Sequence, residues 1–145
     1  MFYVLVFCLI NNHLKCCSGS DNEERRRDAS ERLKDYIDSN LDDEMVIVLG
    51  DYNDDISDEY SYDNVFWNFV EDSNHYRFAD MAIAKGSNYY WSYPGKRYLS
   101  HLDHILISNE LFYKHQTTVT IRPSFCQSDY LEKGSDHRPV MAVFK

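Results

Sequence analysis

Four short apolar runs in this chain each carry polar residues at one end only, and this pattern constrains the fold more than any other feature. The first two runs, residues 1–10 and 45–49, are followed by polar side chains, whereas the last two, within 101–108 and 135–145, are preceded by them. If all four polar ends meet, the first two strands run parallel and the last two run antiparallel to them. The pattern therefore predicts a mixed β-sheet with polar residues along one rim.

The segment 18–40 is predicted to form the helix that connects the first two strands. Its apolar residues, Tyr36 among them, recur at helical spacing and would face the sheet. Ser20 and Glu23 have the spacing of a capping box, and the run Arg25–Arg27 is expected on the solvated face. A short helix over 63–71 and an aromatic loop over 89–98 complete an α/β fold, with helices flanking a mixed sheet.

Length and charge limit what this chain can be. With 145 residues it is long enough for one domain and too short for two. Fifteen basic residues against 24 acidic ones give a net charge of −9, so the surface does not attract nucleic acid by itself. That balance suits a site that recruits a divalent cation, or simply a soluble surface. The opening run 1–10 is too short to span a membrane and lacks the basic start of a signal peptide, so we interpret it as a buried strand.

The residues at the predicted rim have the types that phosphoryl chemistry needs. Carboxylates such as Asp51 and Asp136 can bind Mg²⁺ or accept a proton from an attacking water. Asp103 next to His137 would fix the tautomer of the imidazole, and the Asn53 amide can donate to a phosphate. His13 would donate to another phosphate oxygen. This set predicts hydrolysis of a phosphodiester or phosphomonoester.

Competing chemistries fit the sequence less well. No G-x-S-x-G nucleophile elbow and no phosphate-binding P-loop motif occurs. Paired carboxylates for glycoside hydrolysis stay open, although they would leave both histidines unused. In the aromatic loop, Trp91 and Arg97 are candidate substrate contacts, with packing as the alternative interpretation.

The segments "NNHLK", "VLGDYND", "SHLDHILIS" and "SDHRPVMAVF", in this order, resemble the successive motifs of the endonuclease/exonuclease/phosphatase superfamily, the DNase I-like fold. The resemblance implies that His13 and His137 flank the scissile phosphate, and that Asp51 orients or activates the water. It also implies that Asp103 supports His137 and that Asp136 lies beside the metal, Mg²⁺ or else Mn²⁺ or Ca²⁺. Asn53 would contact phosphate, and Asn12 is a further candidate for substrate binding.

The same resemblance predicts that residues 1–145 are an N-terminally truncated domain. The family fold is a four-layer α-β-β-α sandwich whose first half carries an Asn and a metal-binding Glu, and neither has a counterpart here. We therefore expect half of the sandwich, an exposed apolar sheet face that favours self-association, and weak hydrolysis by this chain alone.

The function that the sequence favours is a divalent-metal-dependent phosphodiester hydrolase acting on nucleic acid. A non-catalytic remnant or binding module is the alternative from another class. A phosphatase or phospholipase that acts on an inositol phosphate or a sphingolipid also suits the same residues. The resemblance extends to a bacterial, often secreted branch, which points to an extracellular or periplasmic location for the full-length parent.

Overall fold

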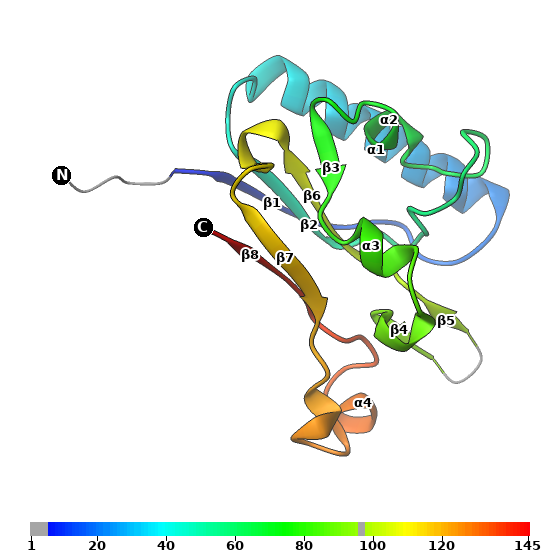
Figure 1. Ribbon diagram of the computed structural model, residues 1–145. Helices are drawn as coiled ribbons and strands as arrows, with labels where there is room; N and C mark the ends of the chain where they lie inside the picture. The colour runs from blue at the N-terminus through cyan, green and yellow to red at the C-terminus, as the bar shows by residue number, and fades with distance from the viewer. Residues whose placement is uncertain (1–5, 96–97) are drawn as a thin grey trace.

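The centre of the protein is a four-stranded mixed β-sheet (Figure 1). The computed structural model describes residues 6–95 and 98–145. Two strands run parallel, a third runs antiparallel to them, and a short fourth pairs with the third. This arrangement confirms the predicted mixed sheet for the first three strands. In spatial order the strands are β1 (Cys8–His13), β2 (Val46–Asp51), β6 (Asp103–Ser108) and β3 (Tyr76–Phe78).

The long helix α1 (Ser20–Asn40) covers one face of this sheet (Figure 1), as the sequence predicted. Three details of the prediction are wrong. Gly19 caps the helix, and no side-chain capping bond forms at Ser20. Arg26 is 2% exposed because its guanidinium binds Asp54, and Tyr36 is 56% exposed. The physical reason is that tertiary contacts, rather than the helix itself, decide which side chains are buried.

The main hydrophobic core lies between α1 and the sheet. Aromatic side chains dominate it: Tyr52 packs edge-on against Phe66 and Phe78, with ring centroids 5.1 and 5.8 Å apart. Apolar residues of β2 and β6, Val48 and Leu106, complete the layer.

The predicted short helix 63–71 is present but smaller. The short elements are α2 (Trp67–Val70), α3 (Met81–Ala84), α4 (Tyr130–Lys133), η1 (Asn88–Tyr90), η2 (Asn109–Leu111), η3 (Pro123–Phe125), β4 (Tyr93–Pro94) and β5 (Leu99–Ser100).

A separate two-stranded sheet lies over the other face of the central sheet. It consists of β7 (His115–Thr120) and β8 (Val140–Phe144), which pair antiparallel. Alternate residues of β8, including Ala142 and Phe144, pack on Ile105 and Ile107 of β6. The prediction that the last strand joins the main sheet is therefore wrong. Its residues bury on one face only, as is typical of a strand in a second, packed sheet.

β1 is an edge strand of the central sheet, and it is only half covered. The strand begins at Cys8 and alternates between partly buried and exposed residues. Leu9, which pairs with the buried Ile47, is 57% exposed. The predicted fully buried strand over 1–10 is wrong from Cys8 onward because one of its faces is uncovered, and residues 1–5 lie outside the described part of the chain. None of the described helices combines the length and apolarity that a membrane span needs.

Candidate active site

Three of the predicted site residues lie side by side across one rim of the central sheet. His13 ends β1 and pairs with Asp51 at the end of β2, and Asp51 pairs with Asp103 at the start of β6. Residues that pair directly across a sheet point to the same face. The strand register therefore places an imidazole and two carboxylates in one row.

His137 reaches the same row from the loop that precedes β8. Its Nδ1 lies 2.7 Å from Oδ2 of Asp103, and both side chains are about three-quarters buried. This bond and the negative charge of Asp103 raise the pKa of His137 above its usual value. A ring that donates from Nδ1 to a carboxylate presents its Nε2 as the acceptor when neutral. Tyr93 packs against the ring, with centroids 5.0 Å apart.

Asp51 is the most electrostatically perturbed carboxylate of the row. Burial raises its pKa, and the neighbouring Asp103 carboxylate raises it further, while the amide of Asn53 and the two histidines act in the opposite direction. Its Oδ1 accepts the Asn53 amide hydrogen at 2.9 Å, and its Oδ2 lies 3.6 Å from Nε2 of His13. At two adjacent carboxylates a divalent cation would relieve the repulsion between their charges. Carboxylate oxygens such as those of Asp51 are the hard donors that such an ion prefers.

Asn53 does not continue the row of β2. The strand ends at Asp51, and Asn53 has a φ of 55°, so its side chain leaves the alternation on which the prediction depended. Its Nδ2 donates to the carbonyl of Leu14 at 3.1 Å. One of the two hydrogens on Nδ2 thus holds the segment that follows β1, and the predicted contact of Asn53 with phosphate stays a prediction.

Asn12, a predicted substrate contact, points away from the other candidates. Adjacent residues of a strand face opposite sides, so His13 and Asn12 cannot share a face. The Asn12 amide is buried, and neither of its polar atoms has a hydrogen-bond partner in the described residues. Asn11 lies two residues before His13 and shares its face. Period-two alternation therefore places Asn11, rather than Asn12, on the face that carries His13.

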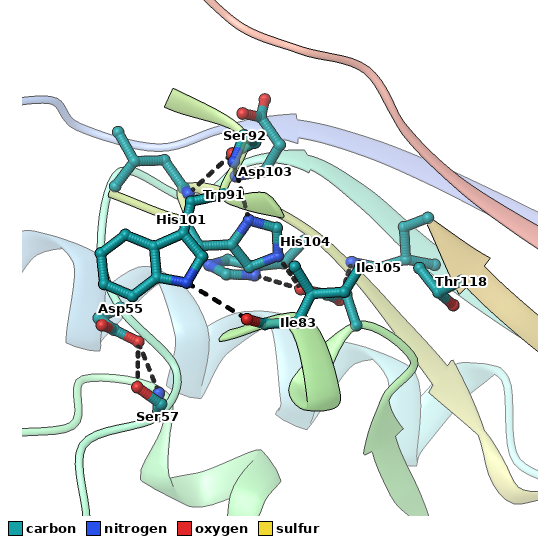
Figure 2. A network of polar contacts seen from close by, with 12 residues as sticks. Asp55, Ser57, Ile83, Trp91, Ser92, His101, Asp103, His104, Ile105 and Thr118 are labelled. Atoms are coloured by element: carbon teal, nitrogen blue, oxygen red, sulfur yellow. Dashed lines mark hydrogen bonds and ion pairs between the residues drawn. The ribbon is translucent and has the colours of Figure 1, made fainter. Parts of the chain in front are cut away.

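The remaining predicted residues are placed less centrally. Asp136 is exposed and directly precedes His137. The indole nitrogen of Trp91 donates to the carbonyl of Ile83 at 3.2 Å, so this donor holds the loop to α3 (Figure 2). Arg97 lies outside the described residues.

A second cluster of polar residues, which was not predicted, is buried in the interior near the start of β6. Asp80, His101 and His104 are each at most 1% exposed, and their ligand-type atoms lie within 4.8 Å of one another. Figure 2 shows His101 and His104 beside Ser92 and Asp103. Asp80 comes from the segment between β3 and α3, and no local sequence pattern links this segment to the two histidines.

The comparisons with known proteins agree with this geometry. The family model described as "Endonuclease/Exonuclease/phosphatase family" matches residues 2–137. An AP endonuclease from Archaeoglobus fulgidus superimposes with a TM-score of 0.67 at 18% identity, covering 94% of this chain and 61% of that protein. No curated protein sequence matches the chain.

Two further solved structures share the fold. The 3′ phosphatase NExo from Neisseria, bound to a product DNA hairpin, has a TM-score of 0.63 and 20% identity, with 94% of this chain and 60% of that one covered. The catalytic domain of human Nocturnin, with a bound sulfate anion, has a TM-score of 0.62 and 21% identity, with coverages of 96% and 47%. The present chain thus spans roughly half to three-fifths of the length of these structures. Since the family model covers nearly all of the sequence, the chain belongs to the endonuclease/exonuclease/phosphatase family.

Proposed function

We propose that this chain carries the hydrolytic centre of a divalent-metal-dependent phosphodiester hydrolase that acts on nucleic acid. The observation that carries the proposal is the register that aligns His13, Asp51 and Asp103, with His137 bound to Asp103 at 2.7 Å. Membership of the family supports hydrolysis of a phosphate ester. The solved relatives named for an AP endonuclease and for a product DNA hairpin support nucleic acid as the substrate class.

Each residue of the row has a role that follows from its surroundings. Asp103 fixes the Nδ1–H tautomer of His137 and stabilises the imidazolium that forms when Nε2 takes up a proton. A protonated His137 can then donate to a non-bridging oxygen of the scissile phosphate. His13, on the exposed edge strand, can donate to a second oxygen. Asp51 is suited to accept a proton from the attacking water, because its raised pKa makes it a better base than an ordinary aspartate.

A divalent cation fits the oxygen donors at this rim. Asp51 and Asp136 would hold it, and when bound it would neutralise charge on the phosphate and favour ionisation of a water. The chain has a net charge of −9, which repels a polyanion. Positive charge supplied at the rim would offset that repulsion locally, and this supports Mg²⁺ or Mn²⁺ as part of the substrate complex.

The proposal is tested by hydrolysis of bis(p-nitrophenyl) phosphate and of an end-labelled DNA hairpin in millimolar Mg²⁺ or Mn²⁺. We expect slow cleavage that stops with EDTA and in Asp51→Asn. Asp28→Asn is the matched control, because Asp28 is an exposed carboxylate on α1 that only pairs with Arg32. Equal rates in both variants, or cleavage that survives EDTA, would contradict the proposal. p-Nitrophenyl phosphate, a monoester, distinguishes phosphatase from phosphodiesterase activity.

A further inference from the structure

We propose that Ser92, held in place by the buried cluster of Asp80, His101 and His104, is a positioning residue for the Asp103–His137 pair. The effect of Ser92 on catalysis rests on the proposed hydrolytic function, whereas the contacts of Ser92 with the neighbouring backbone do not depend on it. Ser92 precedes the β4–β5 hairpin and is completely buried.

Ser92 contacts the backbone on both sides of the pair (Figure 2). Its Oγ accepts the amide hydrogens of Leu102 and Asp103, at 3.0 and 3.1 Å. Its carbonyl accepts the amide of Arg138, the residue that follows His137, at 2.7 Å. One residue therefore fixes the start of β6 and the approach to β8 relative to each other. These two segments carry the carboxylate and the imidazole, which meet at 2.7 Å.

Ser92 is in turn held by His101. The Ser92 amide donates to Nδ1 of His101 at 3.2 Å, so that nitrogen carries a lone pair and the proton of the neutral ring is on Nε2. Nε2 then donates to Oδ2 of Asp80 at 3.0 Å. The contact defines one tautomer of His101.

Asp80 is the centre of the buried cluster. Its Oδ2 also accepts from Nδ1 of His104 at 2.6 Å, and its Oδ1 accepts the amide hydrogen of Ile105 at 2.8 Å. The Nε2 of His104 faces the carbonyl of Asp54 at 3.0 Å, an oxygen that can only accept. Both ring nitrogens of His104 therefore donate, and the ring is an imidazolium paired with the Asp80 carboxylate. Breaking one partner of such a buried pair is costly, which makes the cluster a rigid support.

The same hydrogen count shows which hydrogen bonds a metal ion on this cluster would have to replace, since its ligand atoms lie within 4.8 Å of one another. A metal on Nε2 of His101 would need a lone pair there, while Nδ1 already uses its lone pair for the Ser92 amide. The ring would have to be an imidazolate. His104 has both nitrogens protonated. The cluster is therefore a hydrogen-bonded support for Ser92.

The test compares Ser92→Ala with Ser108→Ala. Ser108 is a matched control, because it lies at the other end of β6, is 6% exposed, and its Oγ accepts the Val46 amide at 3.0 Å. Ser92→Ala leaves the amides of Leu102 and Asp103 without their acceptor, and Ser108→Ala leaves that of Val46. Both variants are therefore expected to lose stability, Ser92→Ala the more. Of these two serines, Ser92 alone contacts the backbone next to Asp103 and His137.

Two readouts separate positioning from structural support. The first is the proton resonance of the His137 Nδ1–H at a fixed pH in metal-free buffer, which reports its bond to Asp103. The second is the split between kcat and KM for bis(p-nitrophenyl) phosphate. In Ser92→Ala we expect the resonance to move upfield or to be lost, and kcat to fall about 10- to 100-fold with KM nearly unchanged. In Ser108→Ala neither readout should change.

An unshifted His137 resonance in a folded Ser92→Ala protein would overturn the proposal. If Ser92→Ala does not fold, the ring ¹⁵N shifts of wild-type His101 decide the matter. A proton on Nδ1 would overturn the proposal, and a proton on Nε2 supports it. If the wild type cleaves no phosphodiester but Ser92→Ala still moves the His137 resonance, the proposed function fails while the positioning role holds.

Discussion

At the scale of single residues, the rim places two carboxylates next to each other, an arrangement that destabilises the fold but is useful for binding a cation or activating a water. Asp51 and Asp103 are paired carboxylates across the β2–β6 ladder, and burial together with the neighbouring charge raises the pKa of Asp51. Like charges directly opposite each other in a sheet are destabilising. Residues chosen for stability alone would not be placed in this way, which agrees with a functional role for the row.

The raised pKa of Asp51 gives a prediction with a definite sign. A carboxyl group whose pKa is higher in the folded than in the unfolded state costs stability once it is ionised, so at pH 7 its charge destabilises the fold. Asp51→Asn removes the charge and keeps an oxygen that can accept the Asn53 amide. We expect urea unfolding at pH 7 to show unchanged or slightly increased stability, by less than about 1 kcal/mol, together with loss of hydrolysis. A melting temperature lower by many degrees would show instead that Asp51 is a structural turn residue.

Part of the site could be predicted from single residues and their neighbours. His13, Asp51, Asp103 and His137 were predicted because each borders an apolar run, and the structure brings them together. Asn12 lies on the opposite face of β1 from His13, which the period-two alternation of the strand would have indicated, and its role in substrate binding stays a prediction. Asn53 does not lie in the row with Asp51, because its own φ is positive, and the sequence "GDYND" does not reveal this. Ser92 and Asp80 carry no local signal, since their roles depend on contacts with distant segments.

At the scale of elements, the close approach of β1 and β2 depends on Gly50. Gly50 has a φ of 139°, and a Cβ at this position would lie 1.9 Å from the carbonyl oxygen of Asn12. The positive φ and the close carbonyl oxygen of Asn12 both exclude a larger residue at position 50, directly before Asp51 at the rim.

We therefore expect Gly50→Ala to destabilise the protein by more than about 3 kcal/mol. Gly19→Ala is the matched control, because Gly19 also has a positive φ, 114°, but a Cβ there would meet nothing within 4 Å. It should cost about 1–2 kcal/mol from backbone strain alone. Urea unfolding of both variants measures the difference. Equal losses would show that the contact with Asn12 does not matter and that β1 can move aside.

The buried pair of Asp80 and His104 joins α3 to β6, and it predicts a pH dependence of stability. Bonds to two histidines lower the pKa of Asp80 despite its burial, and the charge of Asp80 raises the pKa of His104 despite its own burial. The stabilisation from His104 is complete below its unfolded pKa, near 6.5, and is lost as the pH rises through its higher folded pKa. That from Asp80 is present above its unfolded pKa, near 3.8, and is lost as the pH falls through its lower folded pKa.

The unfolding free energy should therefore decrease as the pH rises above about 6.5. His137 also has a raised pKa and contributes in the same direction. The measurement is urea unfolding from pH 5 to 9 in Asp103→Asn, which removes the largest cause of the raised His137 pKa and leaves the contribution of His104. A flat profile in this variant would mean that His104 is uncharged in the fold.

At the scale of the whole molecule, the chain forms α1, the central sheet and a small covering sheet, in that order of layers. The order of strands β1, β2 and β6 and the helical connection could be predicted, because hydrophobic runs and polar ends define direction. The pairing of β8 with β7 could not, because β7 reads "HQTTVT", with few apolar residues and no clear alternation. On the exposed side of β1 only Leu9 is apolar, beside Asn11 and His13, so little of the expected uncovered apolar surface is present there. Self-association through this strand stays a prediction.

Above all, we propose that the rim row, with His137 supported by Asp103, hydrolyses phosphodiesters. Asp103→Asn tests it most directly, because the amide keeps the size of the side chain while removing the charge that fixes and stabilises the imidazolium. The measurement is the turnover of bis(p-nitrophenyl) phosphate in Mn²⁺ by wild type and variant, after circular dichroism has shown that both are folded. We predict that turnover falls by a factor of about 100 or more in the variant. Near wild-type turnover in folded Asp103→Asn would remove Asp103 and its bond to His137 from the mechanism and contradict the proposed function.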